Sequence, residues 1–140
     1  QIDQFHAHLT KLNNKGAGWV AGGDLNSLPD GSEVLKEFVD ECSGESRFEG
    51  DNYEGEEAWL DELFEDFNSL MPLDEYKEDN SPWFSYTGDA SVGWTRTLDY
   101  LFTNGVWLEG EVMQSEEQGG YDTLPLSDHA PVRAVLEVAQ

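Results

Sequence analysis

Three short stretches of the sequence place carboxylates, an amide or an imidazole where predicted strands end or loops begin. They are GGDLNSLPDG with Asp24 and Asn26, RTLDYLF with Asp99, and LSDHAP with Asp128 and His129. In α/β proteins such strand-end loops converge on the ligand site, because loops carry variable side chains on a fixed scaffold. We therefore expect the three stretches to meet in the folded chain.

Asp24 and Asn26 follow the small, apolar run AGWVAG and lie beside Gly and Pro residues. This composition is typical of a turn, because Asp and Asn side chains bond to nearby backbone groups. Alternatively, the carboxylate and the amide face a substrate. The stretch by itself leaves both interpretations open.

Asp99 lies between Leu98 and Tyr100 in a strand-like run, where a carboxylate is costly to bury without a partner. It requires a histidine, a cation or a metal. His129 is a candidate, since a carboxylate on one imidazole nitrogen fixes the tautomer and leaves the other nitrogen for a substrate oxygen. We therefore expect Asp99 and His129 to pair.

The elements that must position these residues are predicted from hydrophobic periodicity. The pattern predicts strands at 4–10, 17–22, 83–87, 95–102, 106–113 and 131–138, helices at 30–42 and 59–70, and a surface loop at 43–58. Asn104 and Gly105 predict a hairpin turn between two of these strands, because both residues tolerate positive φ. His6 and His8 lie in the first predicted strand, where a histidine is more often structural than catalytic.

The composition indicates one folded domain, residues 1–140, with a strongly anionic surface. There are 30 Asp and Glu against 7 Lys and Arg, a formal net charge of -23, and the 12% aromatic residues argue against an acidic disordered chain. Such a surface repels polyanions and suits a high-salt solvent. The sequence contains no cluster of Lys and Arg of the kind that binds a phosphate backbone, so nucleic acid is possible but not favoured as a partner.

No apolar run in the sequence is long enough to span a membrane. We expect a soluble protein, either cytoplasmic in a salt-adapted organism or secreted.

Taken in order, GGDLN, RTLDY and a closing SDHAP before a final strand resemble the endonuclease/exonuclease/phosphatase superfamily of metal-dependent phosphohydrolases. HAHLT is similar to that family's His-Leu strand, so the resemblance runs from about His8 to the C-terminus. The SDH-x-P element is the most specific of the four motifs, and the His-Leu match is the least specific.

The resemblance implies a role for each matching residue. Asp24 would orient or deprotonate the attacking water, and Asn26 would hydrogen-bond the phosphate as it becomes trigonal-bipyramidal. Asp99 would pair with His129, which would contact the phosphate oxygens and stabilise developing charge. Asp128 would lie at or beside the divalent metal.

His8 would be a second phosphate-facing or acid/base histidine, with His6 as a competing candidate. Oxygen-rich ligands favour Mg²⁺, with Mn²⁺ possible and zinc a weaker alternative through the histidines. The lone Cys42 allows neither an intrachain disulfide nor a cysteine metal site.

The fold class that the resemblance implies is α+β, in full a two-sheet, four-layer α/β/β/α sandwich. In that family an N-terminal half contributes a metal-binding Glu and an Asn. We therefore expect this chain to be the C-terminal half of a longer enzyme or a truncated gene product. Self-association would then follow from a sheet face without its partner.

The predicted function is Mg²⁺-dependent hydrolysis of phosphate esters, by a phosphodiesterase or a phosphatase. One alternative is a metal-dependent endonuclease or exonuclease that acts on DNA or RNA. A second alternative is an acidic, non-catalytic binding module on a truncated scaffold.

Overall fold

The computed structural model describes residues 1–32, 57–87, 91, 93–115 and 127–137. The predicted helix at 30–42 and the predicted loop at 43–58 fall almost entirely outside these ranges, as does Cys42. Within the described part of the chain, no helix is long and apolar enough to cross a membrane.

The described residues form a small mixed α/β domain with two antiparallel sheets, which fits the coarse α+β class. One sheet has the strand order β1-β3-β2, and the other pairs β4 with β5. The elements in chain order are α1 (Ile2–Asn13), β1 (Val20–Asp24), α2 (Glu57–Asp66), β2 (Asn68–Ser69), α3 (Leu73–Glu78), the 3-10 helix η1 (Ser81–Trp83), β3 (Asp99–Thr103), β4 (Trp107–Val112) and β5 (Val132–Leu136).

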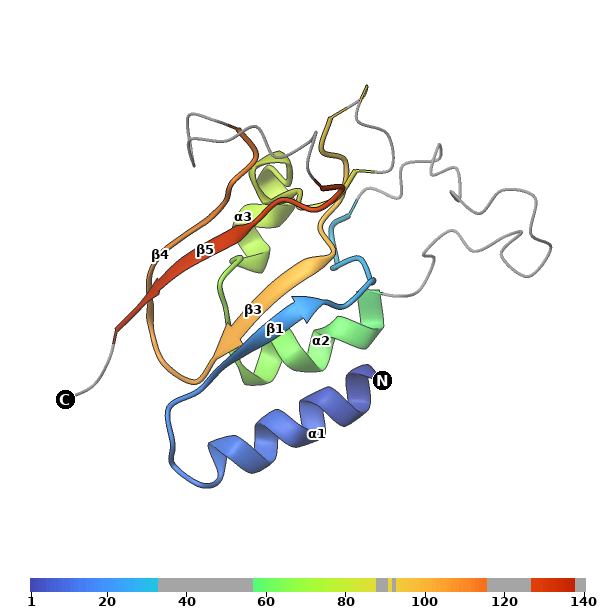
Figure 1. Ribbon diagram of the computed structural model, residues 1–140. Coiled ribbons are helices and arrows are strands. Elements are labelled where there is room, and N and C mark those ends of the chain that lie inside the picture. The colour runs from blue at the N-terminus through green and yellow to red at the C-terminus, as the bar shows by residue number, and fades with distance from the viewer. Residues whose placement is uncertain (33–56, 88–90, 92, 116–126, 138–140) are drawn as a thin grey trace.

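The core lies between helices α1 and α2 and one face of the β1-β3-β2 sheet (Figure 1). Tyr100 and Phe102 of β3 pack there with Leu9 of α1 and with Leu60 and Leu63 of α2. Because successive residues of a strand point to opposite faces, their neighbours along β3 face away from these helices. That opposite face of β3 is turned toward the β4-β5 sheet (Figure 1).

The predicted strand at 4–10 is wrong, because residues 2–13 form helix α1. The side chains that pack on the core are Ile2, Phe5, Leu9 and Leu12, which recur at helical spacing. The alternation in QFHAHLT covers too few residues to distinguish a period of 2 from a period of about 3.6. Over the full span of residues 2–13, the spacing of the apolar residues is helical.

Strand β1 runs from Val20 to Asp24, so the strand predicted at 17–22 is present but shifted toward the C-terminus. Two glycines allow the strand to continue to Asp24. A Cβ on Gly22 would collide with the carbonyl oxygen of Tyr100, and Gly23 has a φ of 142°, which favours glycine. Asp24 is therefore the last residue of a strand and not part of the following loop.

The helix predicted at 59–70 ends earlier, at Asp66. Asn68 and Ser69 instead pair with β3 as strand β2, and the Leu70 N–H donates to Leu101 O at 2.8 Å. The backbone of this segment is thus satisfied by the sheet, which overrides the apolar spacing of the sequence.

The turn at Asn104 and Gly105 joins β3 to β4, but these strands belong to different sheets and form no hairpin. The Asn104 side chain accepts from the Trp19 N–H at 3.1 Å and donates to Ala17 O at 3.0 Å. The turn is thereby held against the segment before β1, and β4 pairs with β5 instead.

The strand predicted at 83–87 is also wrong. Trp83 ends the 3-10 helix η1, and Tyr86 then forms single bridges to Arg96 and to His129. The N–H groups of Ser85 and Tyr86 both donate to Arg96 O, at 2.7 and 2.9 Å. Two consecutive donors on one carbonyl interrupt a regular ladder, as in a β-bulge.

Candidate functional site

The site begins with two aspartates at one end of the β1-β3-β2 sheet. Strands β1 and β3 are antiparallel, and their register places Asp24 directly opposite Asp99. Directly opposite residues of an antiparallel pair project to the same face, so the two carboxylates share one face at this edge. The last residue of β1 thus meets the first residue of β3.

His129 joins these two carboxylates from a segment distant in sequence. Its Nδ1 lies 2.7 Å from Asp99 Oδ2, and its Nε2 lies 4.0 Å from Asp24 Oδ2. An ionised carboxylate can only accept, so the Nδ1–H donates to Asp99 and Nε2 remains for a further partner. The predicted Asp99–His129 contact and the predicted convergence of the three stretches are both confirmed.

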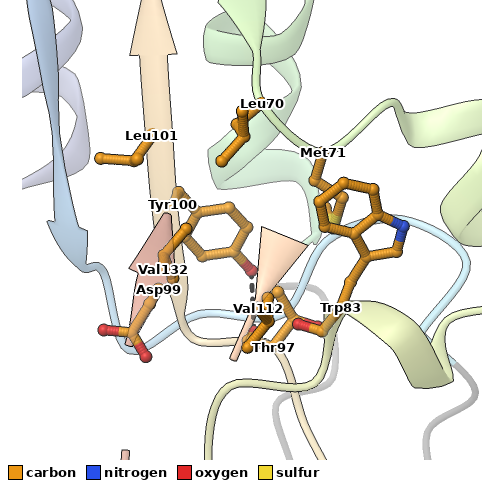
Figure 2. A pocket seen from close by; sticks show the side chains of 9 residues that line it. All are labelled: Leu70, Met71, Trp83, Thr97, Asp99, Tyr100, Leu101, Val112 and Val132. Carbon is orange, nitrogen blue, oxygen red and sulfur yellow. Dashed lines mark hydrogen bonds between the residues drawn. The ribbon is translucent and has the colours of Figure 1, made fainter. Parts of the chain in front are cut away.

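Asp99 lies at the border between an apolar interior and this polar edge. Together with Leu70, Met71, Trp83, Thr97, Tyr100, Leu101, Val112 and Val132 it lines a cavity of about 10 Å³. Figure 2 shows the Asp99 carboxylate turned away from Met71 and Trp83. Such a cavity holds one water at most, so a larger ligand does not fit on this side of Asp99.

The electrostatic surroundings of His129 favour its charged form. Burial of the ring by itself would lower the pKa, but the hydrogen bond to Asp99 and the charges of Asp99, Asp24 and Asp128 act in the opposite direction. Their combined effect raises the pKa of His129 above its ordinary value of 6.5. The three carboxylates therefore stabilise the protonated form of the imidazole relative to the neutral form.

The loop that carries His129 is held by its backbone. The His129 N–H donates to Ser127 Oγ at 3.0 Å, which makes a tight turn. On either side, the Thr87 N–H donates to Asp128 O at 3.0 Å and the Ala130 N–H donates to Ser85 O at 2.7 Å. The imidazole thus projects from a loop with bonds on both flanks, and Asp128 lies exposed beside it.

Asn26 and Asp24 confirm the turn interpretation of GGDLNSLPDG. The Asn26 N–H donates to Asp24 Oδ1 at 2.8 Å, which is the bond of an Asx turn, and Asn26 has a φ of 48°. Asp24 Oδ2 is the oxygen that faces His129. One oxygen of Asp24 therefore makes the turn while the other lies at the candidate site.

His8 lies on helix α1 and its side chain is exposed, so the predicted position in a His-Leu strand is wrong. Among the described residues, no hydrogen bond or ion pair joins His8 to Asp24, Asp99 or His129. The competing candidate, His6, is bonded to Asp66 of α2 at 2.8 Å. The structure therefore brings Asp24, Asp99, Asp128 and His129 together and joins Asn26 to Asp24 through its backbone N–H. Over the described ranges, His8 has no bond to any of them.

Metal binding at this edge of the sheet depends on which side-chain donor atoms lie close together. In the described part of the chain, no three His, Cys, Asp or Glu side chains are grouped so that they could hold a metal ion. Asp99 is bonded to His129 and one oxygen of Asp24 to Asn26, whereas the exposed Asp128 carboxylate is a candidate oxygen ligand. A Mg²⁺ ion commonly uses only one or two protein carboxylates and keeps several waters.

Sequence reasoning missed two side chains beside the histidine. The Tyr86 ring lies 4.9 Å from the His129 ring between centroids, at an interplanar angle of 59°. On the same tyrosine, the guanidinium carbon of Arg96 lies 5.1 Å from the ring centroid. The Tyr86–Arg96 bridge brings these two side chains together, and no local pattern in the sequence indicated that contact.

Comparisons of the chain with protein-family models, with curated proteins and with solved structures found no match. The chemistry of the site therefore rests on its own geometry. The Nε2 of a protonated imidazole can donate to an anionic oxygen, and the nearby Asp24 carboxylate can accept a proton from a water.

Proposed function

We propose that this chain is a metal-dependent hydrolase of phosphate esters, a phosphodiesterase or a phosphatase, of the endonuclease/exonuclease/phosphatase type. The observation that supports the proposal is the position of His129, at 2.7 Å from Asp99 and 4.0 Å from Asp24. Hydrolysis of a phosphate ester requires an oriented water and a donor to the phosphoryl oxygens. Asp24 would orient the water, and His129 would be the donor to the phosphoryl oxygens.

The residues of this chain would act as follows. Asp24 Oδ2 accepts a hydrogen bond from the attacking water and, as the bond to phosphorus forms, its proton. The P–O bond to the alcohol breaks in the same reaction, and the leaving oxygen takes a proton from solvent water. Asp99 keeps the Nδ1–H of His129 in place, so that Nε2–H donates to a phosphoryl oxygen and stabilises the charge that develops there. The exposed Asn26 amide would bind another phosphoryl oxygen.

The proposal includes Mg²⁺ because the carboxylates at this edge of the sheet would repel an anionic substrate. Asp24, Asp99 and Asp128 outnumber the single imidazolium, so an anionic ester would meet net negative charge. When bound, Mg²⁺ (or Mn²⁺) would neutralise charge and polarise the phosphoryl group. Asp128 would supply a ligand, with waters and the substrate phosphate as the others.

The wider fold and setting belong to the same proposal. The face of β3 that carries Asp99 and Leu101 is turned toward β4 and β5, which is the arrangement that a four-layer α/β/β/α sandwich requires between its sheets. The net charge of -23 favours a small or lipid-like ester over nucleic acid, and activity in high salt.

The test is phosphate release from a panel of synthetic monoesters and diesters, and nicking of plasmid DNA, each with and without Mg²⁺ and at low and high salt. We expect Mg²⁺-dependent hydrolysis of the small esters, which the D24N and H129Q variants lose. Cleavage of DNA alone would favour the nuclease. A folded chain that binds Mg²⁺ but hydrolyses nothing would favour the non-catalytic binding module and overturn the proposal.

A further inference from the structure

Ser85 is fully buried and bonds to both segments that form the His129–Asp99 pair. Its Oγ accepts the N–H groups of Leu98 and Asp99, each at 3.1 Å. Its carbonyl oxygen accepts the N–H of Ala130, the residue after His129, at 2.7 Å. One residue therefore fixes the backbone on each side of a pair whose members are 30 residues apart.

The Ser85 hydroxyl accepts two successive backbone N–H groups at the start of β3. Successive N–H groups of a regular strand point in opposite directions, so one oxygen cannot normally accept both. Here the Leu98 and Asp99 N–H groups converge on Ser85 Oγ, which sets the irregular backbone from which the Asp99 side chain projects. In the buried interior, removal of this acceptor leaves two donors without a partner, and the backbone must move to satisfy them.

We propose that Ser85 is a positioning residue, which acts through the backbone of Asp99 and Ala130 to hold the Asp99 carboxylate against His129 Nδ1. It touches neither the reacting atoms nor the imidazole. Its consequence for turnover rests on the proposed phosphate-ester hydrolysis, whereas its consequence for the geometry of the pair does not. The groups that face His129 are Asp99, Asp24, Asp128 and the Tyr86 ring.

The residue types at this position are restricted by the same geometry. Alanine removes the acceptor and keeps the shape, whereas threonine keeps the hydroxyl and adds a methyl group. Thr103, at the other end of β3, is an equivalent buried hydroxyl, since its Oγ1 donates to Trp19 O at 2.6 Å and accepts the Gly105 N–H at 3.0 Å. T103V is therefore a matched control on the same strand, away from the pair.

The experiment measures the low-field proton NMR signal of the His129 Nδ1–H in the metal-free protein, with ¹⁵N labelling to assign it. In the wild type, the bond to Asp99 should protect this proton from exchange. We expect S85A to lose or shift the signal, S85T to restore it at least in part, and T103V to leave it unchanged. If S85A does not fold, S85C, which keeps a weak acceptor of similar shape, should show a weakened signal.

Kinetics supply the second readout. Removal of a side chain that orients a functional group commonly lowers activity about 10–100-fold, and we expect S85A to lower kcat by about that factor with little change in KM. An unchanged Nδ1–H signal in folded S85A, or an equal change in T103V, would overturn the positioning role. A wild-type chain without ester turnover, whose signal is nevertheless lost in S85A, would refute the proposed function and leave the positioning role intact.

Discussion

Two histidine–carboxylate pairs of almost the same length lie in different surroundings in this molecule. His129 Nδ1 is 2.7 Å from Asp99, and His6 Nε2 is 2.8 Å from Asp66. The Asp99 side chain is only 18% exposed, whereas Asp66 is 58% exposed, and Glu62 near the same histidine is 72% exposed. The first pair joins the end of a sheet to a loop, and the second joins two helices.

The difference lies in what the second nitrogen of each ring can reach. His129 Nε2 lies 4.0 Å from Asp24 Oδ2, beyond hydrogen-bond distance. His6 Nδ1 lies 3.6 Å from Glu62, and its ring packs 5.4 Å from the Phe67 ring between centroids. A short His–Asp contact is therefore no sign of catalysis. What separates the two pairs is the second carboxylate, because Asp24 lies opposite Asp99 in the sheet whereas Glu62 is an exposed residue of α2.

The largest expected effect is on turnover, and it compares the two histidines directly. H129Q should lower the rate of ester hydrolysis about 10²–10³-fold, because a charged donor to the phosphoryl oxygen is lost. H6Q should leave kcat within experimental error, because it removes a contact between helices. Phosphate release under saturating substrate measures both. Equal losses in the two variants would remove the distinction between the pairs.

The second largest expected effect is on stability, when the carboxylate of either Asp99 or Asp66 is replaced by an amide. D99N removes the negative charge that accepts from the His129 Nδ1–H and should lower the free energy of unfolding by about 1–2 kcal/mol at a pH at which His129 is charged. D66N should have a smaller effect, because its exposed position is screened by water. Urea unfolding followed by tryptophan fluorescence measures the two values. A larger loss in D66N would contradict the ranking.

A pH dependence of stability should follow from the raised pKa of His129. A group with a raised pKa in the folded state stabilises the fold fully below its unfolded pKa, near 6.5, and this contribution disappears as the pH rises through the folded value. The free energy of unfolding of the wild type should therefore fall over this interval relative to that of H129Q. Parallel curves for the two proteins would argue against the raised pKa.

The smallest expected effect concerns the contact between α1 and α2. H6Q should destabilise the protein by only about 0.2–1 kcal/mol, since the partner carboxylates are exposed. High salt should reduce the difference further, because screening weakens exposed ion pairs. Thermal unfolding at low and high salt is the measurement. A loss of several kcal/mol would indicate that His6 contributes mainly through its packing on Phe67.

Local signals in the sequence were sufficient where a single strand or turn decides the structure. The strands that begin at Asp99, Trp107 and Val132 are present, with shorter bounds than the apolar runs suggested. In the last strand, alternate residues are more buried, as its alternating pattern indicates. The turn bond between Asn26 and Asp24 is equally local, because it spans two residues.

Predictions failed where a partner distant in sequence competes with the local pattern. Residues 68 and 69 leave the helical pattern because β3 supplies their backbone partners. The segment after Trp83 gives up a regular strand because the N–H groups of Ser85 and Tyr86 converge on one carbonyl. The turn at Asn104 leads into another sheet because its side chain is bonded to the segment before β1.

The sequence by itself determined which residues could do chemistry, since Asp24, Asp99 and His129 were identified from residue type and position alone. It also determined that Asp99 needs a partner, because a carboxylate in an apolar run is costly to bury. It further predicted His129 as that partner, which the structure confirms. Only the tertiary structure decided that Asp24 lies near the other nitrogen of His129 and that His8 lies on a helix instead of a strand. The reason is the antiparallel register of β1 and β3 together with the backbone bonds of Ser85, which bring segments far apart in the chain to one edge of a sheet.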